Sequence, residues 1–160
     1  MAPFGQGYRW HCTGLFHDES GAPSGKATVG NTLLRRLDRK IGKNTEALAD
    51  YYAENMEDCE VAVVSFGSSA MAALSAVRRA RKQGLKAGML RLKTMWPFPD
   101  KTVGDLLGRA RTVIVPEMNL GQLALEIERV VHCDTEVVKL GKVNGELFHP
   151  DEVFNVLKEA

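Results

Sequence analysis

Cysteine is scarce in this sequence of 160 residues. The three cysteines, Cys12, Cys59 and Cys133, are far apart and form no C-x-x-C pair. A closed zinc site or an iron–sulfur cluster normally takes four ligands, so we expect neither centre to be built by this chain alone. Reduced thiols are the simplest interpretation of the three cysteines, and they indicate a cytoplasmic location.

Long apolar runs and an excess of charge are also missing. No apolar run approaches the roughly 20 residues that span a membrane, and the N-terminus lacks the apolar core of a signal peptide. The 21 Lys and Arg residues are balanced by 20 Asp and Glu residues, for a formal net charge of +1. This balance gives no general attraction to nucleic acid or to a lipid surface. We therefore expect neither among the partners.

Signature motifs of catalysis are absent as well. The sequence contains no G-x-x-x-x-G-K, no G-x-G-x-x-G, no G-x-S-x-G and no histidine pair at metal-binding spacing. His11, His17, Asp18 and Glu19 lie near one another in the sequence, but their spacing matches no common metal site. We therefore assign no catalytic residue and no metal ligand.

The sequence does contain an alternation of short apolar runs and amphipathic stretches. Residues 61–66 form a nearly continuous apolar run, which is typical of a strand buried on both faces. Residues 67–69 offer a tight turn, and apolar residues then recur at helical spacing over 70–83. Gly84 ends this helix and residues 87–92 begin a second strand. The pattern predicts a βαβ unit with parallel strands.

The alternation continues to the end of the chain. We predict further strands at 112–116 and 135–140 and helices at 100–107, 123–131 and 150–157. Asp100 is expected to cap its helix, and Pro150 suits the first turn of the last one. A turn-rich connection at 141–150 holds one more short strand as a candidate. Residues 59–160 are therefore predicted to form an α/β domain with a mostly parallel sheet and helices on both faces.

Residues 1–27 have a different composition. They are rich in Gly, Pro and Ser and show no sustained periodicity, which predicts a linker or leader from a preceding domain. We expect this segment to be largely disordered or to depend on a neighbouring chain. Tyr8, Trp10, Leu15 and Phe16 would be awkward in a free tail, so the segment is expected to pack on something.

Residues 28–58 are predicted to contain one long amphipathic helix, from Thr28 to Met56. Its apolar residues recur at three- and four-residue steps and Gly42 is its weak point. The opposite face carries the basic residues Arg35, Arg36, Arg39, Lys40 and Lys43. These residues form either a docking surface for an acidic partner or a solvated face, and the sequence favours the solvated face.

Three loops should meet at one edge of the predicted sheet, because ligand sites in such folds lie beyond the carboxyl ends of the strands. They are residues 67–69, 94–99 and 117–122. Gly67, Ser68 and Ser69 are candidates for an anion site, where a phosphate or carboxylate would meet the start of a helix. A purely structural helix cap is the favoured alternative.

The other two loops carry candidate interface residues. Trp96 and Phe98 lie on the proline-stiffened segment KTMWPFPD, where they either cover the end of the core or anchor an interface. Glu117, Asn119 and Gln122 supply polar groups at a strand end, and Glu117 lacks a neighbouring histidine or carboxylate for acid–base work. We expect all five residues to face a partner.

Five segments together resemble a known family. They are HCTGLFHDESG (11–21), FGSSA (66–70), LRLKTMWPFPD (90–100), VIVPEMNLGQL (113–123) and VNGELFHPDEV (143–153). In this order they are similar to the C-terminal part of the alpha subunit of 2-oxoacid:ferredoxin oxidoreductases, and the 2-oxoglutarate type is the most similar. The match runs along nearly the whole chain, and WPFP and PEMNLGQ are its most specific parts.

The resemblance implies a transketolase C-terminal-like domain of a thiamine-diphosphate enzyme, a three-layer α/β/α sandwich with a five-stranded, mostly parallel sheet. It implies a non-catalytic structural and assembly role in an enzyme that converts a 2-oxoacid and coenzyme A to acyl-CoA, CO2 and reduced ferredoxin. Thiamine diphosphate, Mg²⁺ and iron–sulfur clusters would lie in other domains, because the family's GDG motif is missing here. The expected partners are those domains or subunits, ferredoxin through the complex, and coenzyme A as a further candidate.

The same resemblance implies that this chain alone is inactive. It would be either a piece of a longer subunit or a separately encoded piece of a split one, and the residues that select the 2-oxoacid would lie elsewhere. Two alternatives from other classes remain open. One is a stand-alone module that binds a phosphorylated or carboxylated small molecule at Gly67–Ser69, and the other is an adaptor that uses the basic helix.

Overall fold

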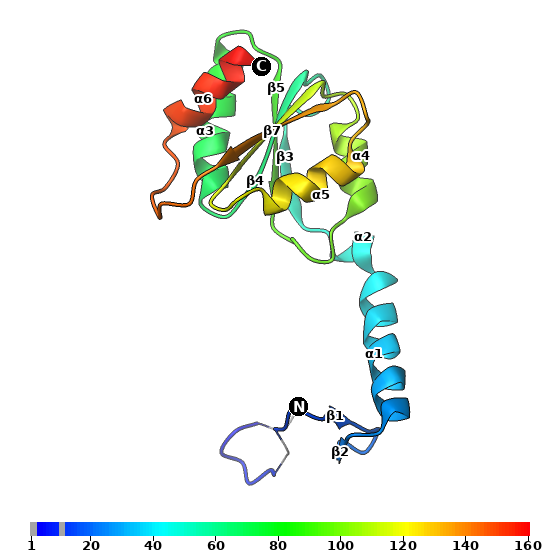
Figure 1. Ribbon diagram of the computed structural model, residues 1–160. Helices are drawn as coiled ribbons and strands as arrows, with labels where there is room; N and C mark the ends of the chain where they lie inside the picture. Colours follow the sequence, from blue (N-terminus) through cyan, green and yellow to red (C-terminus); the bar gives the residue numbers. More distant parts are fainter. Residues whose placement is uncertain (1–2, 10–11) are drawn as a thin grey trace. The chain divides into compact units, whose positions relative to one another are not determined.

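A computed structural model describes residues 3–9 and 12–160 (Figure 1). The chain divides into two compact units, Met1–Asn44 and Thr45–Ala160, which we call the N-terminal unit and the α/β unit. Trp10 and His11, which the sequence analysis singled out, lie outside the described residues. None of the helices in the described ranges is long and apolar enough to cross a membrane.

The N-terminal unit consists of a small hairpin and one helix. Strands β1 (Phe16–His17) and β2 (Pro23–Ser24) pair antiparallel, and α1 (Ala27–Gly42) follows. The carboxylate of Asp18 closes the hairpin turn by accepting hydrogen bonds from the backbone N–H groups of Ser20 (2.9 Å) and Ala22 (3.1 Å). The composition of residues 1–27 had predicted no regular structure, so the hairpin was missed.

Gly30 is what allows the hairpin to lie against the helix. A Cβ atom at this position would approach the ring of Phe16 to 2.5 Å, so only glycine leaves room for the ring. Gly30 is also the one residue of α1 that is buried. The ring of Phe16 therefore packs directly on the helix backbone at Gly30.

The prediction of one helix from Thr28 to Met56 is wrong. Helix α1 ends at Gly42, a short helix α2 (Thr45–Leu48) follows, and β3 (Tyr51–Glu54) is a strand. The physical reason is that β5 offers a free edge, and residues 51–54 satisfy its backbone groups by pairing antiparallel with it. Glycine is a poor helix former, so the helix yields at Gly42.

The α/β unit continues with alternating strands and helices. These are β4 (Val61–Phe66), α3 (Ser69–Lys82), β5 (Ala87–Leu92), α4 (Asp100–Leu107), β6 (Thr112–Glu117), α5 (Gln122–Val130), β7 (Glu136–Gly141) and α6 (Pro150–Glu159). The five-stranded sheet has the order β3-β5-β4-β6-β7, and every neighbouring pair is parallel except β3 with β5. The predicted fold class is confirmed. The fifth strand is β3, however, and the candidate strand after residue 141 does not form.

The sheet has helices on both of its faces (Figure 1), and it separates two hydrophobic clusters. Helices α4 and α5 cover one face, where Val64, Leu90, Val113, Leu107 and Ile127 are among the buried residues. Helices α3 and α6 cover the other face, where Val63, Met89, Ile114, Val77 and Phe154 are buried. Successive residues of β4, β5 and β6 point to opposite clusters, so these strands are apolar over most of their length.

Candidate assembly surface at the carboxyl ends of the parallel strands

The connections that leave the parallel strands meet at one edge of the sheet, which we call the carboxyl edge. It comprises residues 67–71, 93–99, 117–122 and 142–149. Each connection exposes at least one large apolar side chain, namely Met71, Trp96, Leu120, Val143 and Leu147. Their exposed fractions run from 55% for Met71 to 89% for Leu120. Exposed apolar residues gathered on one side of a domain are typical of an interaction surface.

The opposite edge of the sheet is closed by ion pairs. Glu60 pairs with Lys86 (2.8 Å) and with Arg111 (2.6 Å), and Asp58 pairs with Arg81 (2.7 Å). Hydrogen bonds from Lys86 and Arg111 hold the pKa of Glu60 below its usual value. These five charged groups are thus paired within the domain.

Trp96 and Phe98 lie on the same loop but have different environments. Trp96 is 74% exposed, whereas Phe98 is half-buried and packs against the core. Arg129 of α5 lies over the ring of Phe98, 5.8 Å from its centroid. The two aromatic residues therefore differ: Phe98 covers the end of the core, as one alternative predicted, and Trp96 does not.

The same arginine holds the end of the loop in place. Two nitrogens of Arg129 donate hydrogen bonds to the two carboxylate oxygens of Asp100, each at 2.6 Å. These hydrogen bonds lower the pKa of Asp100. The expectation that Asp100 caps its helix is wrong, because the N-cap of α4 is Pro99 and the carboxylate is engaged by Arg129. Trp96 is therefore presented by a loop whose end packs on the core through Phe98 and is bonded to α5 through Asp100.

Glu117 is buried at the carboxyl end of β6 and is 1% exposed. Its carboxylate accepts hydrogen bonds from the backbone N–H groups of Leu123 (2.8 Å) and Ala124 (3.0 Å), which are at the start of α5. A negative charge at a helix N-terminus is favourable because it offsets the helix dipole. Glu117 anchors α5 inside the domain and does not belong to its exposed surface, contrary to the expectation that it faces a partner.

Asn119 shapes the loop between β6 and α5. Its side-chain oxygen accepts hydrogen bonds from the backbone N–H groups of Gly121 and Gln122, both at 2.9 Å. Glu117 and Asn119 together engage the N–H groups at the start of α5, so this helix end has none of them left for an anion. Gln122 is exposed, and Leu120 lies at the tip of the loop. The sequence analysis missed Leu120. An apolar residue between polar turn residues is the pattern that could have indicated it.

Gly67, Ser68 and Ser69 form the turn between β4 and α3. Gly67 has φ +56°, which glycine adopts without strain. Ser68 is the N-cap of α3 but its side chain makes no capping hydrogen bond, and its hydroxyl lies 3.7 Å from the sulfur of Met118. Ser69 is buried. An anion site at these residues stays a prediction.

The chemistry available to the described residues is limited. Across residues 3–9 and 12–160, no group of three His, Cys, Asp or Glu side chains is placed to hold a metal ion. Cys12 and Cys133 are exposed and Cys59 is buried, and burial raises the pKa of the Cys59 thiol. Three separate thiols do not fit an iron–sulfur cluster, which takes four ligands.

Comparisons with known proteins agree with the resemblance indicated by the five sequence segments. Residues 59–153 match the family described as pyruvate:ferredoxin oxidoreductase core domain II. Over 153 residues the chain is 42% identical to the 2-oxoglutarate synthase subunit KorA of Methanocaldococcus jannaschii, covering 96% of this chain and 41% of that protein. The chain spans about two fifths of the length of that protein and of two further KorA subunits that it matches.

Two solved structures share the architecture. The 2-oxoglutarate:ferredoxin oxidoreductase from Magnetococcus marinus, with 2-oxoglutarate, coenzyme A and succinyl-CoA bound, aligns with a TM-score of 0.79 at 26% identity. That alignment covers 99% of this chain and 28% of the other. A split-gene transketolase, described as an inactive beta4 tetramer, aligns with a TM-score of 0.56 at 21% identity over 65% of this chain and 39% of its own. The second likeness shows the fold alone, and it confirms the expected transketolase-like architecture.

Proposed function

We propose, because this chain belongs to the pyruvate:ferredoxin oxidoreductase core domain II family, that it is a structural and assembly domain of the alpha subunit of a 2-oxoglutarate:ferredoxin oxidoreductase. The whole enzyme converts a 2-oxoacid and coenzyme A to acyl-CoA, CO2 and reduced ferredoxin in the cytoplasm. The names and lengths of the relatives support this proposal, since this chain matches only part of each of them.

In this proposal the chain supplies a scaffold and other polypeptide supplies the chemistry. Thiamine diphosphate, Mg²⁺ and the iron–sulfur clusters are held by the other domains or subunits, which are also the partners of this chain. Ferredoxin and coenzyme A are reached through the complex. In support of this, the described residues offer neither four ligands for an iron–sulfur cluster nor a group of side chains placed to hold a metal ion.

The observation that carries the assembly role is the exposed Trp96 on its clamped loop. The bond from Arg129 to Asp100 and the packing of Phe98 hold the loop before any partner binds. Little loop entropy is then lost when Trp96 docks. Tryptophan is also among the residues that contribute most to binding at interfaces. Trp96 and the apolar side chains of the carboxyl edge are therefore assigned to the contact with the rest of the enzyme.

Substitution of Trp96 by alanine separates folding from assembly. We expect Trp96→Ala to change the free energy of unfolding of the isolated chain by less than about 0.5 kcal/mol, because the side chain lies outside the core. Association with the co-expressed remaining polypeptides of the enzyme should weaken by about 2 kcal/mol or more. Urea denaturation and binding measurements report the two quantities. Leu85→Ala, at the opposite edge of the sheet, is the matched control and should leave both unchanged.

A large loss of stability in Trp96→Ala with normal assembly would refute the interface assignment. Calorimetry on the chain alone separates the proposal from a stand-alone binding module. We expect no binding of thiamine diphosphate at micromolar concentration and no turnover of 2-oxoglutarate with a dye acceptor. Micromolar binding of inorganic phosphate that is lost in Ser68→Ala would favour the binding module instead.

A further inference from the structure

The two units of the chain carry charge of opposite sign. Residues 1–44 contain seven Lys or Arg and three Asp or Glu residues, a net charge of +4. Residues 45–160 contain fourteen Lys or Arg and seventeen Asp or Glu residues, a net charge of −3. The overall charge of +1 therefore hides a basic N-terminal unit.

The basic residues of α1 have almost no partners. Arg35 donates a hydrogen bond to the side-chain oxygen of Asn31 (2.9 Å). The side chains of Arg36, Arg39 and Lys40 on the helix, and of Lys43 directly after it, form no hydrogen bond or ion pair with any described residue. Every ion pair among the described residues lies instead within Thr45–Ala160, from Arg78 with Glu54 to His149 with Asp151. Single solvated lysines and arginines are ordinary. A basic helix such as α1 in which no cation forms an ion pair differs from the rest of the described chain.

An apolar stripe runs beside these cations. Val29, Leu33, Leu37 and Ile41 recur at four-residue steps and so lie along one face of the helix. Leu37 is 42% exposed, and Leu34, at the side of the stripe, is 53% exposed. At helical spacing Arg36, Lys40 and Lys43 fall along one flank of this stripe. Beyond the reach of the hairpin, α1 thus presents apolar and cationic side chains next to one another.

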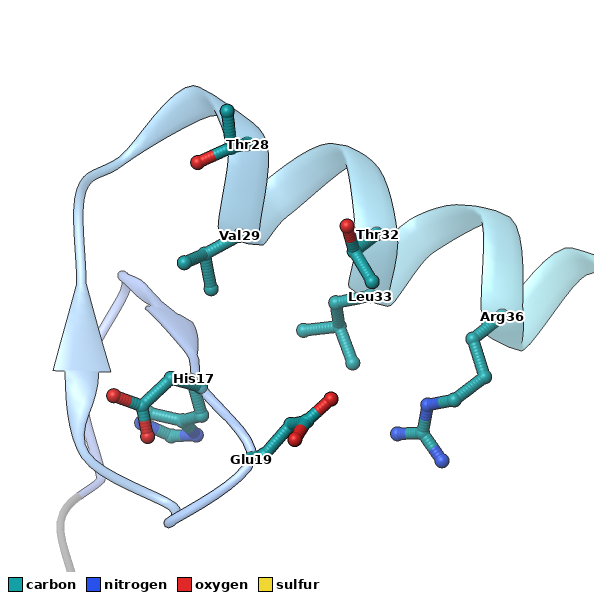
Figure 2. Close-up of a pocket in the computed structure, with 8 residues that line it drawn as sticks. His17, Glu19, Thr28, Val29, Thr32, Leu33 and Arg36 are labelled. Carbon is teal, nitrogen blue, oxygen red and sulfur yellow. The ribbon is translucent and has the colours of Figure 1, made fainter.

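A pocket of about 550 Å³ lies where the hairpin meets this stripe (Figure 2). Val29 and Leu33 point into it from α1, Arg36 stands at one end, and Glu19 lies across from them on the hairpin. Asp18 also lines the pocket, although its carboxylate is used in the hairpin turn. The pocket has an apolar floor with charged side chains around it. Because it is concave, it can accept a protruding side chain of another protein more readily than it can contact a flat surface.

We propose that the N-terminal unit is a docking element for an acidic protein surface on the remaining part of the enzyme. The stripe and the pocket take apolar side chains of that surface, and Arg36, Arg39, Lys40 and Lys43 pair with its Asp and Glu residues. This inference rests on the proposed function, which supplies the partner, and adds the chemistry of the contact. An anionic lipid surface is disfavoured because the pocket is concave and has the carboxylate of Glu19 beside it.

Charge reversal on α1 tests the proposal in the full chain. The variant Arg36→Glu/Arg39→Glu/Lys40→Glu is co-expressed with the remaining polypeptides of the enzyme, and its dissociation constant is compared with that of the unaltered chain. We expect binding to weaken at least about tenfold at low salt, because like charges then face each other. The unaltered complex should weaken with added NaCl, whereas the variant should bind somewhat better as salt screens the repulsion between like charges.

Lys82→Glu is the matched control, because Lys82 is an exposed and unpaired cation at the end of α3. It should leave the dissociation constant and its salt dependence unchanged. If circular dichroism shows that the triple variant has lost helix, the single variant Arg39→Glu takes its place, with an expected weakening of about threefold. Circular dichroism of this variant should match that of the unaltered chain.

The outcomes separate the two proposals. Normal affinity of a folded charge-reversal variant overturns the docking proposal and leaves the assembly role standing. Absence of any complex with the unaltered chain overturns both. Cosedimentation with phosphatidylglycerol vesicles, but not with phosphatidylcholine vesicles, tests the lipid alternative. Vesicle binding that the reversal abolishes, together with unchanged assembly, would identify a lipid surface as the occupant and overturn the docking proposal.

Discussion

The α/β unit and the N-terminal unit use the same kinds of residues in opposite ways. In the α/β unit both faces of the sheet are covered by helices, and two clusters of apolar side chains are fully buried. In the N-terminal unit one two-stranded hairpin meets one helix, and Gly30 is the only buried residue of that helix. A lone hairpin and a lone helix of this length are each marginal in water. The α/β unit therefore carries its own stability, whereas the N-terminal unit needs something else to cover it.

The two units also differ in whether their charged side chains form ion pairs. Most cations of the α/β unit form ion pairs with carboxylates nearby, as Arg78 does with Glu54 and Arg129 does with Asp100. Within the described ranges, the cations of α1 form no ion pair with a carboxylate. We infer that substitutions in the α/β unit act mainly on folding and that substitutions in the N-terminal unit act mainly on association. Three substitutions test this comparison, from the largest expected effect on stability to the smallest.

Glu117→Gln should cause the largest loss of stability. The amide would keep one acceptor for the N–H groups of Leu123 and Ala124 and would turn a donor toward the other, so a buried N–H loses its partner. We expect the free energy of unfolding to fall by about 2–3 kcal/mol, measured by urea denaturation. Glu128→Gln, on the outer face of the same helix, removes an exposed pair with Lys139 and should cost less than about 1 kcal/mol. Equal losses in the two variants would contradict the anchoring role of Glu117.

Glu54→Gln should have an intermediate effect that depends on pH. Hydrogen bonds from Arg78, and then from Tyr52, lower the pKa of Glu54 from 4.5 to about 2. Because the folded state has the lower pKa, the stabilisation is complete above about pH 4.5 and is lost as the pH falls toward 2. Arg78 is half exposed, so solvent weakens the pair, and we expect a loss of about 1 kcal/mol at pH 7.

Urea denaturation at several pH values between 7 and 3 measures this effect. The difference between the unaltered chain and Glu54→Gln should shrink as the medium becomes more acidic. Glu57→Gln, an exposed position on the following turn, serves as the control and should show little difference at any pH. A constant difference across the range would show that packing, rather than charge, is responsible.

Gly30→Ala should have the smallest effect on stability and still disturb the N-terminal unit. The added methyl group would displace the ring of Phe16 from α1, so we expect faster protease cleavage within residues 12–26. The urea midpoint of the α/β unit should stay the same, within about 0.5 kcal/mol. Gly42→Ala is the control, because an added Cβ meets nothing within 4 Å there. If Gly30→Ala instead lowered the stability of the α/β unit, the two units would be coupled and the comparison would fail.

Much of the α/β unit was determined by the sequence alone. The strands β4, β5 and β6 are buried on both faces, so each had to be a short run of apolar residues, and each was predicted within one or two residues. Glycine and proline marked the ends, as Gly84 does after α3 and Pro150 does at the start of α6. These signals are local, because a residue's burial in a covered parallel sheet does not depend on which strand lies beside it.

Only the tertiary structure decided the residues whose role depends on a distant partner. Tyr51–Glu54 has a spacing that continues the helical pattern, yet it forms a strand because β5, some 40 residues later, needs an antiparallel neighbour. From the sequence alone Glu117 is expected to be an exposed acid, but in the structure it accepts hydrogen bonds from two backbone N–H groups of α5. On the loop before α4, Arg129 packs over Phe98 and leaves Trp96 outside. In each case the sequence allows two environments, and a contact made across the fold selects one of them.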